Sequence, residues 1–187
     1  MEAIQNSVFV TVEEYLTGER QSDIRHEYLG GAVYAMAGAS RDHNIAAGNI
    51  FSALHTHLRG KPCQVFMADI KVRLQIGIDD IFYYPDVLVT CDPRDTDRYF
   101  SRFPKVLIEV LSPETERTDR REKFLSYTQI ETLEEYVLVA QDKIAVTVFR
   151  RANEWQPAIA NKPDLQLRLP SLEFAIPLNA VYEGVKL

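Results

Sequence analysis

The sequence contains no long apolar run that could cross a membrane. No stretch approaches the roughly 18 consecutive apolar residues of a membrane span. The N-terminal residues include acids where a signal peptide carries bases. These absences exclude the usual signatures of membrane and secreted proteins, so the sequence predicts a soluble protein with a cytoplasmic location.

Cysteine is scarce, because Cys63 and Cys91 are the only two among 187 residues. Two isolated cysteines form neither a metal-ligand spacing nor a dense disulfide framework. Reduced thiols are therefore the expectation for this protein, because disulfides are rare in the cytosol.

An excess of positive charge is also absent, since the net charge is -6. This charge argues against general coating of nucleic acid, which needs many Lys and Arg side chains to neutralise phosphates. It is compatible with a local basic patch. The composition, 46% apolar and 26% charged, is ordinary for a globular protein. The length fits a single domain over residues 1–187, because one core of this size is stable alone.

The first half of the chain predicts a helix, a β-hairpin and a second helix. Thr11 and Glu14 have the spacing of a capping box, which predicts a helix over residues 12–19. The Gly30-Gly31 pair in HEYLGGAVYAMAG predicts a tight turn between two strands. A longer helix follows to about residue 59, capped by one of three residues: Ser40, Asp42 or Asn44.

The second half predicts mainly strands, with one further helix from a Thr118 cap to Ile130. In the run CQVFMADIKVRL, alternation places Lys71 and Arg73 on a solvent-facing side. The run KVLIEVL is typical of a central strand covered on both faces. The remaining predicted elements are a strand IFYYPDVLVTC, a hairpin around 141–143, a strand at 155–159, and an edge strand followed by a helix from Leu178. This order predicts an α/β fold with a central mixed sheet flanked by helices.

Two apolar runs each carry a carboxylate, Asp86 in YYPDVLVTC and Glu109 in VLIEVL. Burying an ionised carboxylate is costly unless it is paired or binds a metal. On neighbouring strands the two could bind one Mg²⁺, with Mn²⁺ as an alternative and the backbone carbonyl of Val110 as a further oxygen ligand. From these residues alone, salt bridges to arginines at the strand ends explain the acids equally well.

The stretches YYPDVLVTC, IEVLSPETERTDRREKF and EYVLVAQDKIAVTVFRR resemble the Uma family of restriction-endonuclease-like proteins, within the PD-(D/E)XK nuclease superfamily. The resemblance covers most of the chain, from TVEEYL to the C-terminal strands. It implies the restriction-endonuclease-like fold, with Pro85-Asp86 as the PD element and Glu109 as the second acid. It also implies that Glu27, in the N-terminal hairpin, completes the site.

The sequence departs from the superfamily pattern at the lysine. This lysine usually follows the second acid by two residues, on the same face of the strand, and here that position is Leu111. The resemblance implies that the following helix supplies the lysine, as Lys123 in REKF. Read without the family, Lys123 is an ordinary exposed helix lysine.

Other charged residues carry weaker signals. His43, near the start of the long helix, could bind phosphate or act as a base, although a surface histidine is the simpler interpretation. Asp69 is a candidate for a carboxylate beside the site. Basic residues on both sides of the second acid could form a rim for a phosphate backbone, or pair with neighbouring acids; they are Arg98, Arg102, Lys105, Arg117, Arg120 and Arg121.

The sequence thus predicts a Mg²⁺-dependent endonuclease that hydrolyses DNA phosphodiester bonds. The predicted catalytic residues are Glu27, Asp86, Glu109 and Lys123, and the predicted metal ligands are Asp86, Glu109 and Val110. A homodimer is expected, since two strands must be cut, with the apolar C-terminal segment as a candidate contact surface. The alternative is a nuclease-fold protein without activity that binds nucleic acid or protein. Cleavage of RNA also stays open.

Overall fold

The computed structural model describes residues 9–113 and 115–187. Its largest sheet has the order β11-β10-β9-β8-β6-β3. Strands β8 and β9 run parallel and the other neighbours antiparallel. This is the predicted central mixed sheet. The strands, in sheet order, are Pro157–Ala160, Val146–Arg150, Glu135–Ala140, Pro104–Leu111, Val87–Thr90 and Gln64–Met67.

A smaller five-stranded sheet has the order β2-β1-β5-β4-β7. Its strands are Ala32–Ala35, His26–Leu29, Asp79–Tyr83, Lys71–Ile76 and Phe100–Ser101. Strands β1 and β2 form the hairpin predicted from the paired glycines, and both glycines have positive φ angles, 54° and 97°. A two-stranded sheet pairs β12, Gln166–Leu169, with β13, Phe174–Pro177.

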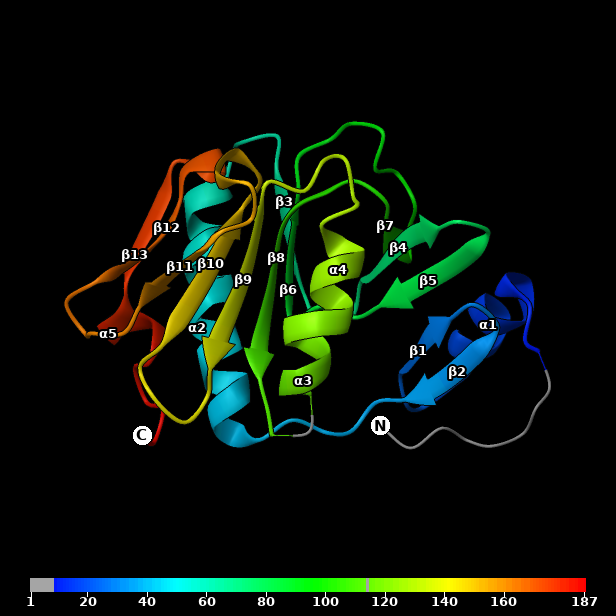
Figure 1. The fold of residues 1–187 in the computed structure, drawn as a ribbon, viewed down its shortest axis with the longest axis horizontal. Helices are drawn as coiled ribbons and strands as arrows, with labels where there is room; N and C mark the ends of the chain where they lie inside the picture. Colours follow the sequence, from blue (N-terminus) through cyan, green and yellow to red (C-terminus); the bar gives the residue numbers. More distant parts are fainter. Residues whose placement is uncertain (1–8, 114) are drawn as a thin grey trace.

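The helices flank the sheets (Figure 1). Helix α1, Val12–Glu19, begins at the predicted capping box, and α2, Arg41–Leu58, is capped by the Ser40 side chain. A composite helix covers the face of the large sheet that lies opposite α2 (Figure 1). It consists of α3 (Glu116–Thr118), a π-helical turn (Asp119–Lys123) and α4 (Phe124–Tyr127). Helix α5 is Leu178–Val181, and short 3₁₀ turns occupy Arg151–Asn153 and Pro170–Leu172. Among the described residues, no helix is long and apolar enough to cross a membrane.

Alternation along β8 divides the core into two layers. Val106, Ile108 and Val110 pack with α2 and the C-terminal hairpin in the larger cluster. Leu107 and Leu111 face the other way and pack against α4 and the five-stranded sheet. Every residue of β8 from Val106 to Leu111 is buried, as predicted for a central strand. Glu109 has the same parity as Leu107 and Leu111, so its carboxylate lies in the layer between the two sheets.

Several sequence predictions are wrong in detail. The runs CQVFMADIKVRL and IFYYPDVLVTC were each expected to form one strand, but each divides between the two sheets, as β3 with β4 and β5 with β6. Ala68, with φ 58°, turns the chain at the first break, and Pro85 lies at the second. Lys71 is buried rather than solvent-facing. The composite helix begins at Glu116 and ends at Tyr127, not over 118–130.

Two further expectations are corrected by the packing. Cys63 and Cys91 are joined by a disulfide next to the paired ends of β3 and β6, so they are not reduced thiols. The apolar C-terminal segment is not an exposed contact surface. Its apolar side chains are buried in the larger core cluster; they are Leu167, Leu169, Leu172, Phe174, Ile176, Leu178 and Val181.

Candidate functional site

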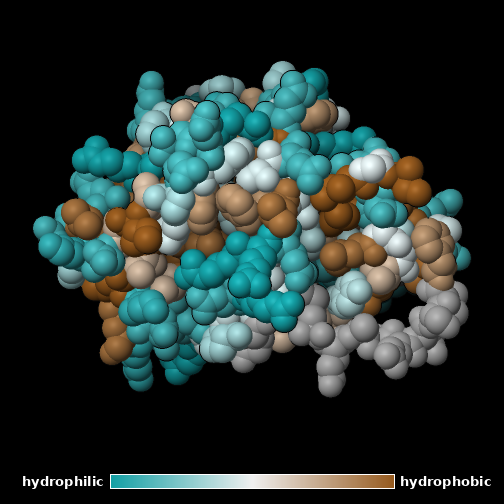
Figure 2. Space-filling view, in the orientation of Figure 1, coloured by the Kyte–Doolittle hydropathy of each residue, from teal (hydrophilic) through white to brown (hydrophobic). Residues whose placement is uncertain are grey.

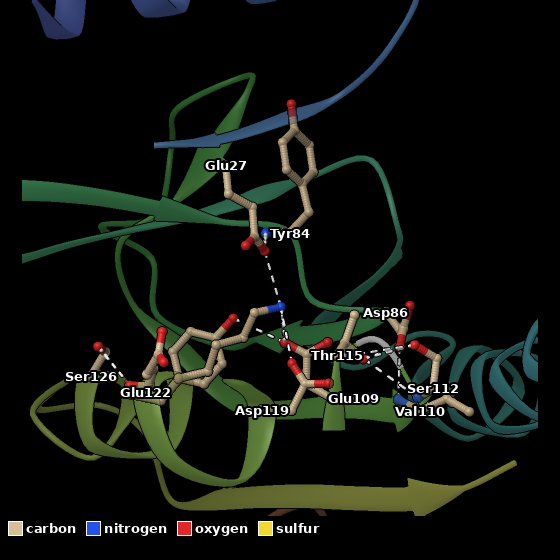
Figure 3. A network of polar contacts seen from close by, with 12 residues as sticks. Glu27, Tyr84, Asp86, Glu109, Val110, Ser112, Thr115, Asp119, Glu122 and Ser126 are labelled. Carbon is tan, nitrogen blue, oxygen red and sulfur yellow. Dashed lines mark hydrogen bonds and ion pairs between the residues drawn. The ribbon is translucent and has the colours of Figure 1, made fainter. Parts of the chain in front are cut away.

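Three carboxylates surround the amino group of Lys123 in the layer between the sheets. Its Nζ lies 3.0 Å from Glu27 Oε1, 3.2 Å from Glu109 Oε1 and 3.3 Å from Asp119 Oδ1. None of these four side chains is more than 6% exposed. Figure 3 shows the three carboxylates pointing toward one another from separate elements. We call this group the acid cluster.

The local fold explains how these residues meet. Glu27 lies on β1, in the hairpin fixed by the glycine turn, and its side chain points to the inner face of the small sheet. Glu109 lies on the inner face of β8. Asp119 and Lys123 are the first and last residues of the π-helical turn, a rare geometry that is frequent at functional sites. This turn lies in a strongly charged segment and directs the side chains of Asp119 and Lys123 inward.

Asp86 lies beside the acid cluster but is more open to solvent, with 20% of its side chain exposed. Its Oδ2 accepts a hydrogen bond of 2.7 Å from the backbone N–H of Val110 and lies 3.2 Å from His43 Nε2. These contacts link the connection between β5 and β6 to β8 and to the start of α2. The orientation of Asp86 is therefore fixed by two elements outside its own.

Burial and charge shift the pKa values of the cluster. Burial raises the pKa of Glu109 well above its usual value, and the charge of Lys123 offsets only part of this effect. Burial also raises the pKa of Asp119. Burial alone would lower the pKa of Lys123, but the charges of Glu109 and Glu27 outweigh it and raise that pKa well above its usual value. Lys123 is therefore a fixed cation at neutral pH, and it cannot serve as a base.

Aromatic side chains close the site. The Tyr127 hydroxyl donates a 3.1 Å hydrogen bond to Glu109 Oε1, and the Lys123 ammonium lies 5.5 Å from the centre of the Tyr83 ring. Burial and the Glu109 charge raise the pKa of Tyr127 well above its usual value. Tyr127 thus stays a hydrogen-bond donor to the carboxylate.

A second buried network supports the site from the α1 side. The Lys71 ammonium donates to the Tyr84 hydroxyl at 3.1 Å, and this hydroxyl donates to Glu19 Oε1 at 3.2 Å. The backbone N–H of Tyr84 donates to Glu27 Oε1 at 3.4 Å. Since Tyr84 also precedes Pro85-Asp86 in the chain, the network fixes two carboxylates of the site at once.

The site has the chemistry that a hard divalent cation requires, because it offers four carboxylates against one lysine. The carboxylates belong to Glu27, Asp86, Glu109 and Asp119. Asp119 Oδ1 is buried at ion-pair distance from Lys123, yet within the described chain it accepts no hydrogen bond. In the arrangement described, however, no three His, Cys, Asp or Glu side chains converge on one point as metal ligands. The Lys123 ammonium lies where the three carboxylates of the acid cluster meet.

The structure brings the predicted Glu27, Asp86, Glu109 and Lys123 together. Val110 contacts Asp86 through its backbone N–H, which donates a hydrogen bond to the carboxylate. Asp69 lies outside the site, 73% exposed and paired with Arg25. The charge of the predicted basic rim is partly neutralised, because Arg120 pairs with Glu116. The side chains of α3 and the π-helical turn form a hydrophilic area on the surface (Figure 2).

Sequence reasoning missed one residue of the site, Asp119, and left the place of a second, His43, open. Asp119 was treated as a surface partner of nearby arginines, although its i, i+4 spacing to Lys123 indicates a shared helix face. His43 was a candidate phosphate ligand or base, with a surface histidine as the simpler interpretation; only 12% of its side chain is exposed, and its buried Nδ1 has no hydrogen-bond partner among the described residues. Its place in the first turn of α2 was the available signal.

Comparisons with known proteins identify the family and the fold. The family model Uma2, described as "Putative restriction endonuclease", matches residues 12–179. Two uncharacterized proteins of Synechocystis sp. are similar: slr1290 is 33% identical, with 92% of this chain and 91% of that protein covered. The second, sll1609, is 30% identical, with 83% and 89% covered. A crystal structure of "a putative nuclease belonging to DUF820" from Anabaena variabilis shares the fold, with a TM-score of 0.76, 17% identity, and 95% and 99% of the two chains covered.

Proposed function

The chain belongs to the Uma2 family of restriction-endonuclease-like proteins, and from this premise we propose that it is a metal-dependent endonuclease that hydrolyses DNA phosphodiester bonds. The observation that carries the proposal is the acid cluster around Lys123 with Asp86 beside it. Buried carboxylates in excess over cations are costly for stability. A cluster of such carboxylates is expected at a functional site that binds a cation.

In this proposal, Asp86, Glu109 and the backbone carbonyl of Val110 would hold Mg²⁺ or Mn²⁺. A divalent ion bound there would activate water and offset negative charge on the phosphate. Lys123, fixed as a cation, would orient the water and stabilise charge that develops on the phosphate oxygens. Glu27 and Asp119 keep the ammonium in place. His43 holds Asp86 in one orientation.

A second candidate is a nuclease-fold protein that binds nucleic acid without cleaving it. The observation favouring it is the position of the Lys123 ammonium where the carboxylates meet, with no ready set of three ligands among the described side chains. If that ion pair is permanent, the residues are a buried structural network and bind no metal.

A cleavage assay separates the two candidates. Supercoiled plasmid and labelled oligonucleotides are incubated with Mg²⁺ or Mn²⁺ and the native chain, Asp86→Asn or Lys123→Gln. Each substitution should reduce cleavage by at least about 100-fold, the loss typical of removing one charge-stabilising group. Asp69→Asn and Lys162→Gln make the same changes of charge at exposed positions, and should cleave normally. Equal cleavage by all five proteins would mean contamination.

Metal binding gives a readout that does not depend on turnover. Titration calorimetry with Mn²⁺ should show one site in the native chain and a loss of affinity in Glu109→Gln. No binding by the native chain, together with retained DNA binding, would establish the non-cleaving candidate.

Three expectations accompany the proposal. We propose that residues 1–187 form one domain, because side chains from the six-stranded and the five-stranded sheets share one core cluster. We propose a cytoplasmic location, where DNA is accessible, although the Cys63–Cys91 disulfide would be an exception among cytosolic proteins. A homodimer would place two sites on opposite DNA strands.

A further inference from the structure

An exposed tyrosine, Tyr99, and three arginines lie at or next to β7, the outer strand of the five-stranded sheet, and the candidate site uses none of them. The Arg20 guanidinium lies 5.9 Å from the centre of the Tyr99 ring, and the Arg102 guanidinium lies 5.4 Å from the centre of the Phe100 ring. Arg98 is exposed next to Tyr99 in the chain. Tyr99 itself is 46% exposed. We call Arg20, Arg98, Tyr99 and Arg102 the Tyr99 surface.

The arginines of this surface have no carboxylate partner. Within the described chain, no carboxylate lies within ion-pair distance of Arg20, Arg98 or Arg102. The nearby acids are engaged in the loop itself. Asp97 accepts a 2.8 Å hydrogen bond from the backbone N–H of Tyr99, and Asp95 accepts one of 3.0 Å from that of Arg102.

These hydrogen bonds also order the backbone of the loop before any ligand binds. Asp95 additionally accepts a hydrogen bond from the Ser101 hydroxyl, and Asp92 pairs with Arg94, whose guanidinium stacks over Phe103. Two capped loop segments therefore fix the backbone that carries Tyr99 and Arg102. A preordered surface loses little conformational entropy on binding.

Two cavities border the surface. One, of about 260 Å³, is lined in part by Arg98 and Phe100, and the other, of about 270 Å³, is lined in part by Arg102 and Phe103. Each combines an arginine and an aromatic side chain with two acids, Asp95 and Asp97 in the first cavity and Asp80 and Glu131 in the second. Proteins that bind single-stranded nucleic acid combine arginine with aromatic side chains: bases stack on aromatic rings while cations contact the phosphates.

We propose that the Tyr99 surface binds a segment of single-stranded DNA, with an unpaired base stacked on Tyr99 and phosphates bound by Arg98 and Arg102. In a duplex the bases are stacked on one another and present only their edges in the grooves, so the ring favours unpaired DNA. The choice of DNA rests on the proposed nuclease function. The surface would hold a strand at a distance from the acid cluster while the chemistry proceeds there.

Binding is measured by fluorescence anisotropy with a labelled oligothymidylate in EDTA, so that no cleavage occurs. Tyr99→Ala should weaken binding about 5- to 100-fold, the range for loss of one stacked base, and Tyr99→Phe should restore it. Arg98→Ala with Arg102→Ala should lower the slope of log K against log salt by about 1.4, because each phosphate contact on a single strand contributes about 0.7.

A control pair removes the same charge elsewhere: Lys162→Ala with Arg168→Ala, both exposed near the C-terminal hairpin. This pair should leave binding and salt slope unchanged. The proposal is overturned if the control weakens binding as much as the arginine pair does. It is equally overturned if Tyr99→Ala binds normally or if duplex DNA binds as tightly as the single strand.

Failure of this proposal can be told apart from failure of the nuclease proposal. Glu109→Gln should lose cleavage but keep oligonucleotide binding, whereas Tyr99→Ala should keep hydrolysis of bis(4-nitrophenyl) phosphate, a substrate with no strand to bind. A native chain that binds as described but hydrolyses nothing supports the surface and refutes the nuclease. A native chain that cleaves DNA, together with normal oligonucleotide binding by Tyr99→Ala, supports the nuclease and refutes the surface.

Discussion

Replacing Lys123 by glutamine tests the physical basis of the acid cluster. The ammonium lies within 3.3 Å of carboxylate oxygens from Glu27, Glu109 and Asp119, and all four side chains are almost fully buried. Removing one partner from a buried ion network costs about 3–5 kcal/mol, because the remaining charges lose their compensation. We expect Lys123→Gln to lose this much stability at pH 8, provided that no divalent cation is present.

The loss should depend on pH, and its sign follows from the carboxyl pKa values. Burial already raises the pKa of Glu109 and of Asp119 above their unfolded values, and Lys123 opposes that rise. Without the lysine, both pKa values rise further. The folded state then holds more protons than the unfolded state above about pH 4, so its stability falls as pH rises. Lys123→Gln should therefore lose less stability at pH 5 than at pH 8.

Urea denaturation followed by circular dichroism measures both values. Lys162→Gln removes an exposed lysine and should change stability by less than about 0.5 kcal/mol at either pH. Mn²⁺ should restore part of the stability of Lys123→Gln, since a ligand at 100 times its dissociation constant stabilises by about 2.7 kcal/mol. An equal loss at pH 5 and pH 8 would refute the account of uncompensated carboxylates.

The other predictions concern the support of the site. Cys63→Ser should destabilise the chain by about 3.6 kcal/mol, the value for cysteines 28 residues apart in the sequence; equal urea midpoints for the native chain with and without reductant would show that Cys63 and Cys91 are free thiols. Tyr84→Phe leaves the buried Lys71 ammonium without its hydroxyl partner and should cost about 1–3 kcal/mol. Tyr99→Phe, at an exposed ring, is the matched control and should unfold at the native midpoint.

The fold could be predicted where local signals decide the structure. Helix α1 has its predicted bounds because Thr11 and Glu14 cap it through contacts three residues apart. The two breaks between strands were missed because each is only three residues long and apolar residues resume after it. Ala68 adopts a left-handed conformation that nothing in its sequence neighbourhood requires. The chain crosses between sheets there, and which sheet a strand joins is decided by partners far away in the sequence.

The site could be predicted only in part for the same reason. Asp86 and Glu109 stood out because acids are unusual in apolar runs. Asp119 belongs to the charged segment TERTDRREKF, in which seven of ten residues are ionisable, and only the π-helical turn decides which of them point inward. Lys71 appeared solvent-facing by alternation, but Tyr84 and α1 cover that face. Burial by a separate element leaves no trace in a strand's own pattern.

The displaced lysine now has a structural reason. Position 111 shares the parity of Glu109, but the Leu111 side chain is 5% exposed and packs among apolar residues between the sheets. A side chain at this position therefore lies in an apolar layer, where an ionised lysine without a partner would be costly. Lys123 enters from the π-helical turn and meets three carboxylates instead. The structure therefore places a cation beside Glu109 although the strand position two residues after that acid is apolar, so a search for a lysine on the strand alone would overlook this chain.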